Sequence, residues 1–186
     1  MTKIRSLLPW FLVPALPLLA PLVAMQFTAE VAWTGSDFLV AYVLLAGAGF
    51  AYRLATSNAS SLAYRAAAGL AVTTGLLLVW INLAVGIIGS EDNPANLLYG
   101  GVLAVGVIGA VLANLDPHGM ARALFATATA QFLVPILALV IWRPRFDAGV
   151  VKILFLNGFF VFLFVVSALL FRNAARRTGG ASATQA

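Results

Sequence analysis

Long apolar stretches separated by short polar ones make up most of the chain, and none of them alternates with a period of two. Each stretch is close to the roughly 20 residues that an α-helix needs to cross the hydrocarbon core of a bilayer. In lipid all backbone polar groups must be paired inside the protein, so spanning segments are helices or closed barrels, and the missing alternation favours helices. We therefore predict an all-α, polytopic transmembrane helical bundle with six spans, at residues 7–26, 37–56, 65–88, 96–114, 120–142 and 150–171.

The composition supports lipid as the main solvent of this chain. Of its 186 residues 62% are hydrophobic and 9% are charged, whereas soluble domains average about 25% charged residues. On a soluble protein the net charge of +5 would suggest nucleic acid. Here the basic residues flank the apolar stretches, which is the signal for membrane topology. We expect the bilayer as partner and no nucleic acid.

The distribution of Lys and Arg predicts how the chain is threaded. With both termini in the cytoplasm, eight of the eleven basic residues lie on the cytoplasmic side, as the positive-inside rule requires. These eight are Lys3, Arg5, Arg53, Arg65, Arg122, Arg172, Arg176 and Arg177. The outer side then holds Arg143, Arg145 and Lys152. The prediction is a multi-pass protein with a cytoplasmic N-terminus and a cytoplasmic C-terminus.

The two ends of the chain differ in what they predict. Pro14, Pro17 and Pro21 fall on one face of the first segment and remove backbone donors, so we expect a kinked span over 7–26. A cleaved signal peptide is the alternative, because Lys3 and Arg5 precede the apolar run. The small, polar stretch 176–186 is expected to be a disordered cytoplasmic tail, which leaves 1–175 as a single transmembrane domain.

Small residues four apart predict where helices pack closely. They recur in the second to fourth spans, and we expect the second to fifth spans to form the tight core. The sixth span is bulky and rich in Phe, and is expected to face lipid or a partner chain. The small pairs and runs are Gly47/Ala51, Ala67/Ala71/Gly75, Gly106/Ala110 and Gly109/Ala113.

The stretch "GSEDNPAN", residues 89–96 and here called the acidic loop, separates the third and fourth spans. Asn93 followed by Pro94 is typical of a helix start, where the Asn side chain accepts from first-turn N–H groups. Carboxylates are favoured near that positive helix end, and Gly86 and Gly89 allow the chain to turn. The alternative to this hinge is a cation or polar-ligand site formed by carboxylates and amides of the loop and the third span.

The strongest polar residues within the predicted spans are three amides, Asn82, Gln131 and Asn157. Such residues usually hydrogen-bond across helices inside a bundle. The alternative is a polar pathway for a neutral solute. The candidate ligand-binding residues, from the loop and the spans together, are Asn82, Glu91, Asp92, Asn93, Asn96 and Gln131.

Side chains that commonly serve in catalysis are scarce in this sequence. It has no Cys and a single His, His118, in a predicted turn after Asp116-Pro117. No acid, Lys or Arg falls at mid-membrane, where proton pumps and voltage sensors carry them. We predict no enzyme activity, no catalytic residue, no metal site and no cofactor.

The stretch from "MQFTAEVAW" through "NLAVGIIGSEDNPAN" to "MARALFATATAQ" resembles a group of small bacterial inner-membrane proteins without an assigned activity. The resemblance covers roughly residues 20–135 and implies a location in the bacterial plasma membrane. The leading functional prediction is a non-enzymatic accessory, assembly or structural membrane component with a membrane-protein partner. The alternative is a small channel or transporter for a neutral solute, built as a homo-oligomer. A gapless match of 38–51 to 97–110 would make the two central hairpins parallel copies of each other, as in some transporters.

Overall fold

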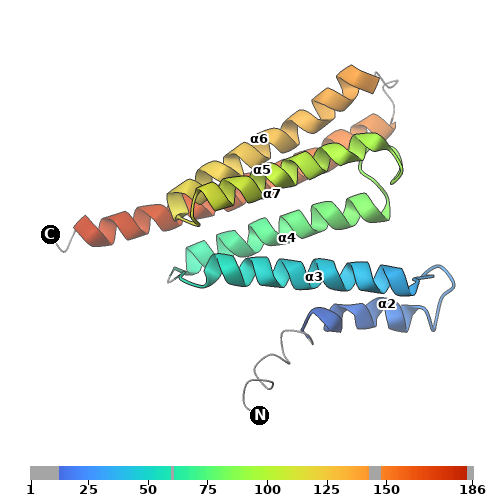
Figure 1. The fold of residues 1–186 in the computed structure, drawn as a ribbon. Helices are drawn as coiled ribbons and strands as arrows, with labels where there is room; N and C mark the ends of the chain where they lie inside the picture. The colour runs from blue at the N-terminus through green and yellow to red at the C-terminus, as the bar shows by residue number, and fades with distance from the viewer. Residues whose placement is uncertain (1–12, 60, 143–147, 184–186) are drawn as a thin grey trace, which may run out of the picture. The chain divides into compact units, whose positions relative to one another are not determined.

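The computed structural model describes residues 13–59, 61–142 and 148–183, and over these residues the chain forms helices and no strand. The all-α prediction is therefore confirmed (Figure 1). The helices are η1 (Leu16–Leu18), α2 (Leu19–Ala24), α3 (Gly35–Thr56), α4 (Leu62–Ala84), η2 (Pro94–Leu97), α5 (Leu98–Leu112), α6 (Pro117–Trp142) and α7 (Ala148–Ala183).

Five of these helical segments are long and apolar enough to cross a membrane, and they match the second to sixth predicted spans. The chain is a multi-helix, membrane-spanning protein. The first predicted span lies partly outside the described residues. Its described part is a shorter apolar helix, Val13–Ala24, in which the 3-10 turn η1 with Pro17 interrupts the α-helical pattern.

The chain divides into two compact units, residues 1–54 and 55–186, where the sequence predicted a single domain. In the first unit, Asp37 caps the start of α3. Its Oδ2 accepts from the backbone N–H and from the hydroxyl of Thr34, both at 2.7 Å. The rings of Trp33 and Phe38 meet edge to face at 5.3 Å across the same turn. The bond from the Thr34 N–H to Asp37 is one arm of a capping box, and together with the hydrophobic staple of Trp33 and Phe38 it marks where α3 begins.

The second unit is a four-helix bundle in which α7 packs against α4 and α6, and α6 also packs against α5. The contact of α4 with α7 combines apolar packing and a hydrogen bond. Ser167 Oγ donates to the Ala67 carbonyl at 2.8 Å, and the Tyr64 and Phe171 rings meet edge to face at 4.9 Å. Small side chains in both helices allow the backbones to approach this closely.

One packing prediction is wrong. The sixth span, α7, does not simply face lipid, because one side of it forms much of the core of the second unit. The physical reason is that α7 carries Phe on both sides, so hydrophobicity alone could not separate its buried side from its exposed side. The place of the second span, α3, in the tight core stays a prediction, and among the described residues of α3 Ala41 alone is buried. The buried residues of α7 are Val150, Asn157, Phe160, Phe164, Ser167, Ala168, Phe171 and Ala174.

Glycines bring α5 and α6 together, as their spacing in α5 predicted. A Cβ added to Gly109 would lie 2.7 Å from the Ala123 Cβ, and one added to Gly106 would lie 3.3 Å from Thr127 Oγ1. The turn between these helices places Asn114 and Leu115 at φ of 47° and 60°, a region that costs L-residues energy.

Two interactions hold this turn between α5 and α6. Asp116 Oδ2 accepts from the N–H groups of His118 and Gly119 and thereby caps α6. The Tyr64 hydroxyl donates to the Leu115 carbonyl at 2.6 Å. His118 therefore lies in the first turn of α6, whereas the sequence analysis predicted it in the turn before the helix.

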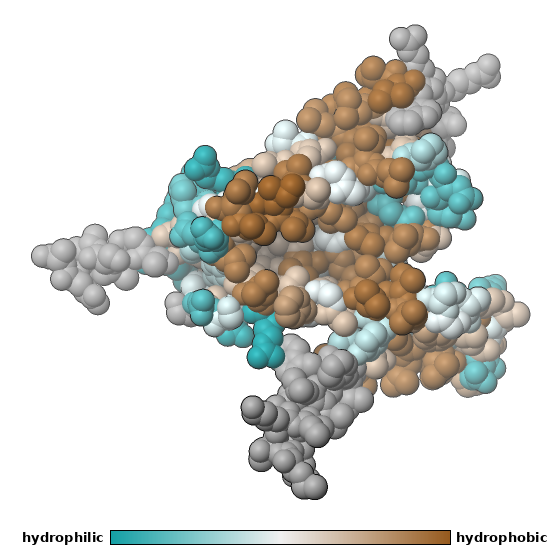
Figure 2. Space-filling view, in the orientation of Figure 1, coloured by the Kyte–Doolittle hydropathy of each residue, from teal (hydrophilic) through white to brown (hydrophobic). Residues whose placement is uncertain are grey.

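At its C-terminal end α7 continues beyond the predicted span end at residue 171 and runs to Ala183. Residues 176–183 are therefore helical where a disordered tail was predicted, and 184–186 lie outside the described residues. Ala174, Ala175, Arg176 and Arg177 are strong helix formers that can extend an established helix. Figure 2 shows apolar side chains along the middle of the bundle helices and polar side chains gathered at their ends.

Candidate functional site

The helix α4 ends at Ala84, four residues before the predicted end of the third span, and the chain then turns into the acidic loop. Gly86 and Gly89 have φ of +67° and +71°, which side chains other than glycine rarely adopt. A Cβ on Gly86 would also collide with the Ser90 carbonyl. The two glycines therefore turn the chain out of α4, as the hinge interpretation expected.

Asn93 and Pro94 start the next helix in the way the sequence predicted. Asn93 is the N-cap of η2, and its Oδ1 accepts from the Ala95 N–H at 3.0 Å. Pro94 occupies the first helical position, where its missing N–H has no intrahelical partner to lose. The hinge prediction is confirmed for this pair.

Asn96 closes the loop upon itself. Its Oδ1 accepts from the N–H groups of Ile87 and Ile88, at 3.2 and 2.9 Å. Its Nδ2 donates to the carbonyls of Ile88 and Ser90, at 3.3 and 2.7 Å. Both halves of this amide are thus bonded to backbone groups that the turn leaves without helical partners, and Ile87, Ile88 and Ala95 are buried around it.

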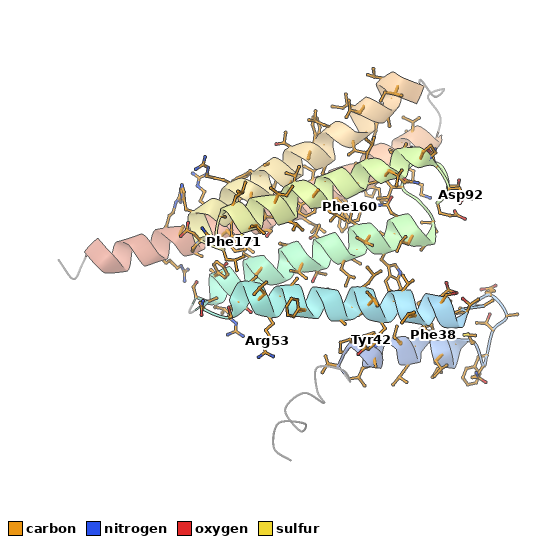
Figure 3. The ribbon with its side chains drawn as sticks, in the orientation of Figure 1. Phe38, Tyr42, Arg53, Asp92, Phe160 and Phe171 are labelled. Carbon is orange, nitrogen blue, oxygen red and sulfur yellow. The ribbon has the colours of Figure 1, made fainter. Side chains whose placement is uncertain are left out.

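The two carboxylates of the loop lie apart from this network. Glu91 and Asp92 are exposed, and Figure 3 shows Asp92 at the loop's outer edge, pointing away from the helices. The described residues contain no group of three or more His, Cys, Asp or Glu side chains placed to hold a metal ion. The arrangement exposes two charges to water and does not aim them into a common pocket.

A second polar group lies inside the bundle, where Tyr99 of α5, Gln131 of α6 and Asn157 of α7 meet; we call it the polar cluster. Gln131 Nε2 donates to Asn157 Oδ1 at 2.9 Å, and Asn157 Nδ2 donates to the Tyr99 hydroxyl at 2.9 Å. The Tyr99 hydroxyl lies 3.2 Å from Asn157 Oδ1, to which it donates. All three residues are buried, with 0% of Gln131 and 2% each of Tyr99 and Asn157 exposed. The cluster ties three helices together, as expected for amides in lipid.

Asn82 does not join the polar cluster. Its Nδ2 donates to the Leu78 carbonyl of its own helix at 2.8 Å. Two buried side-chain atoms in the described part of the chain have no hydrogen-bond partner, Asn82 Oδ1 and Gln131 Oε1. Of the candidate ligand residues, Asn93 and Asn96 thus build the loop, Glu91 and Asp92 lie at its surface, and Gln131 lies in the bundle interior.

Sequence reasoning recognised Gln131 and Asn157 as polar residues within spans but missed Tyr99 as their partner. No local signal in the sequence could have found it, because Tyr99 and Asn157 are 58 positions apart. Comparison with protein-family models, with curated proteins and with solved structures finds no match to this chain.

Proposed function

We propose that this protein is a non-catalytic accessory or assembly component of a bacterial plasma membrane, with both termini in the cytoplasm. The observation that carries the proposal is how the polar groups are used. The side-chain hydrogen bonds of Asn93 and Asn96 stabilise the loop, and those of Asn157 join helices. This is the arrangement expected of a scaffold. The eight-to-three distribution of basic residues supports the threading.

A stripe on α3 supports a helical membrane partner. Leu39, Val43, Gly47 and Phe50 recur three or four residues apart, so they lie on one face of the helix. Within the first unit the three large side chains are exposed, and nothing lies within 4 Å of a Cβ added to Gly47. A small residue flanked by large ones allows another apolar helix to approach closely and pack between them. The occupant that fits is a transmembrane helix of a second protein.

Purification from the native membrane in mild detergent tests this proposal. We expect a partner at fixed stoichiometry that is lost with Gly47→Leu. Gly49→Leu is the matched control, because Gly49 has equally open surroundings but lies on the opposite side of α3. A protein that purifies alone, or a partner that both variants retain, would contradict an assembly role of this stripe.

The threading has its own test. A reporter that is active only outside the cytoplasm should be silent when fused after Ala186 and active when inserted at Asn93. The opposite result would contradict the proposed orientation while leaving the scaffold proposal standing.

One observation favours the second candidate, a channel or transporter for a neutral solute. Gln131 Oε1 has no partner although Gln131 lies near the middle of α6. The test is to reconstitute the purified protein in liposomes and measure glycerol flux. A homo-oligomer that conducts glycerol, and loses this flux with Gln131→Met or Asn82→Leu, would support the channel over the scaffold.

A further inference from the structure

The inference concerns the Gln131 side chain, which the structure buries completely. Its Nε2 is bonded to Asn157 Oδ1, but its Oε1 has no partner among the described residues. An amide oxygen kept from water without a hydrogen bond bears its full desolvation cost. Buried polar atoms in folded proteins nearly always find a partner in protein or bound solvent, so this atom requires an explanation.

Turning the amides around does not remove the unpaired group. If Gln131 alone were rotated, its oxygen would lie 2.9 Å from Asn157 Oδ1, and two acceptors would face each other. If Asn157 were rotated as well, its oxygen would lie 2.8 Å from the Ile153 carbonyl, again acceptor against acceptor. Either rotation also leaves the Gln131 NH2 group in the unpaired place. The cluster therefore lacks one hydrogen-bond donor in its most favourable arrangement.

The chemistry of the missing donor follows from the surroundings. A cation requires several oxygen ligands, and the other side-chain oxygens of the cluster, on Tyr99 and Asn157, already make hydrogen bonds. An anion would be repelled by the amide oxygen. Gln131 is eleven residues from Trp142, about 16 Å along the helix and deep in the hydrocarbon. A neutral O–H or N–H group is what remains.

We propose that Gln131 Oε1 is an internal binding site for a small neutral hydrogen-bond donor, filled by water in the resting protein. The site does not depend on the assembly function proposed above. In a scaffold the site holds a water molecule that exchanges only with bulk water and leaves on drying, whereas in a channel a solute hydroxyl or amide takes its place. Water and solute share the chemistry, and the experiment separates them.

Infrared spectroscopy of the side-chain carbonyl reads this site directly. The chain has three glutamines, at positions 26, 131 and 185. Gln26→Asn with Gln185→Asn leaves Gln131 as the sole glutamine without changing the cluster. With 13C-labelled glutamine in the full-length protein, the labelled carbonyl band reports Gln131 alone. Gln131→Met in the same background is the control that should remove the band.

In buffer without added solute we expect the band at the lowered frequency of a hydrogen-bonded amide carbonyl. Its return to the free-amide frequency on controlled drying identifies the donor as water. A band that reaches the bonded position only when glycerol or urea is added identifies a solute site. A band at the free-amide position in all three conditions would overturn the proposal, and so would a bonded band that drying and solutes leave unchanged. Neither of the two results that would overturn this proposal bears on the scaffold proposal, because that proposal is tested by loss of the partner with Gly47→Leu in α3.

Discussion

Two long apolar helices of this protein, α3 and α7, are used in opposite ways. In the membrane-spanning window of α3 only 6% of the residues are buried, against 28% in that of α7. α7 is nevertheless the more apolar helix and carries more Phe. Because lipid is as apolar as a protein core, hydrophobicity does not say which side of a span is inside. The side chains that differ are polar and small: Asn157, Ser167 and Ala168 lie on the buried side of α7.

The largest expected difference between the two helices comes from their Phe residues. Phe160 in α7 is fully buried and Phe50 in α3 is 66% exposed. Phe160→Ala should lower the free energy of unfolding by about 3–5 kcal/mol, because it removes packing and leaves a cavity. Phe50→Ala should change it by less than about 0.5 kcal/mol. Unfolding of the detergent-solubilised protein by added SDS, followed by circular dichroism, measures both, and similar losses would refute the contrast.

Glycine substitutions sharpen the same contrast at a smaller scale. Gly109→Ala in α5 forces a methyl group against Ala123, whose backbone Cα is also only 3.3 Å from the added atom. We expect a loss of about 1–3 kcal/mol from overpacking. Gly47→Ala in α3 meets nothing and should be neutral or stabilise by up to about 1 kcal/mol through helix propensity. The same unfolding assay applies, and a stable Gly109→Ala protein would show that α5 and α6 are not held this closely.

These contrasts explain how much the sequence could predict. The existence of the second to sixth spans follows from length and apolarity, and the helix start at Asn93-Pro94 follows from local capping chemistry. The glycines of α5 also indicated a close contact correctly. Local signals of this kind act within one or two turns, so they survive in any tertiary arrangement.

The features that the sequence analysis missed depend on contacts between residues that are far apart in the sequence. Tyr99 and Asn157 are 58 positions apart, and no local pattern pairs them. The core side of α7 could not be separated from its lipid side because both carry Phe. Among the candidate ligand residues, Asn96 could be recognised as polar, but its four bonds to the loop backbone require the folded turn.

Helix caps depend on local contacts only, so loss of a cap should lower the free energy of unfolding by a similar amount at the start of α3 and in the acidic loop. Asn93→Ala removes the bond to the Ala95 N–H, and Asp37→Ala removes the cap of α3. Each should cost about 0.5–2 kcal/mol. Asp92→Ala is the control for the loop, because Asp92 is exposed and makes no cap. An Asp92 effect as large as that of Asn93 would mean that charge, not capping, holds the loop.

The cation-site alternative for the acidic loop can be tested in the same material. If the loop only turns the chain, calcium and magnesium should leave the melting temperature unchanged. A rise with either ion that Glu91→Gln with Asp92→Asn abolishes would establish a divalent-cation site there.

Among the substitutions of buried residues, the smallest loss is expected for Ser167→Ala at the contact of α4 with α7. The substitution removes the Oγ bond to the Ala67 carbonyl, but that carbonyl also belongs to the hydrogen-bond ladder of α4 and is not left unpaired. Interhelical bonds of this type in membranes average about 0.6 kcal/mol, so we expect a loss of about 0.5–1 kcal/mol. Thr129→Ala is the control, because Thr129 is exposed and bonds within its own helix, to Phe125. A loss above about 2 kcal/mol would show that α4 and α7 are joined mainly by this hydrogen bond. The expected small loss would instead assign their contact to the packing of Tyr64 and Phe171.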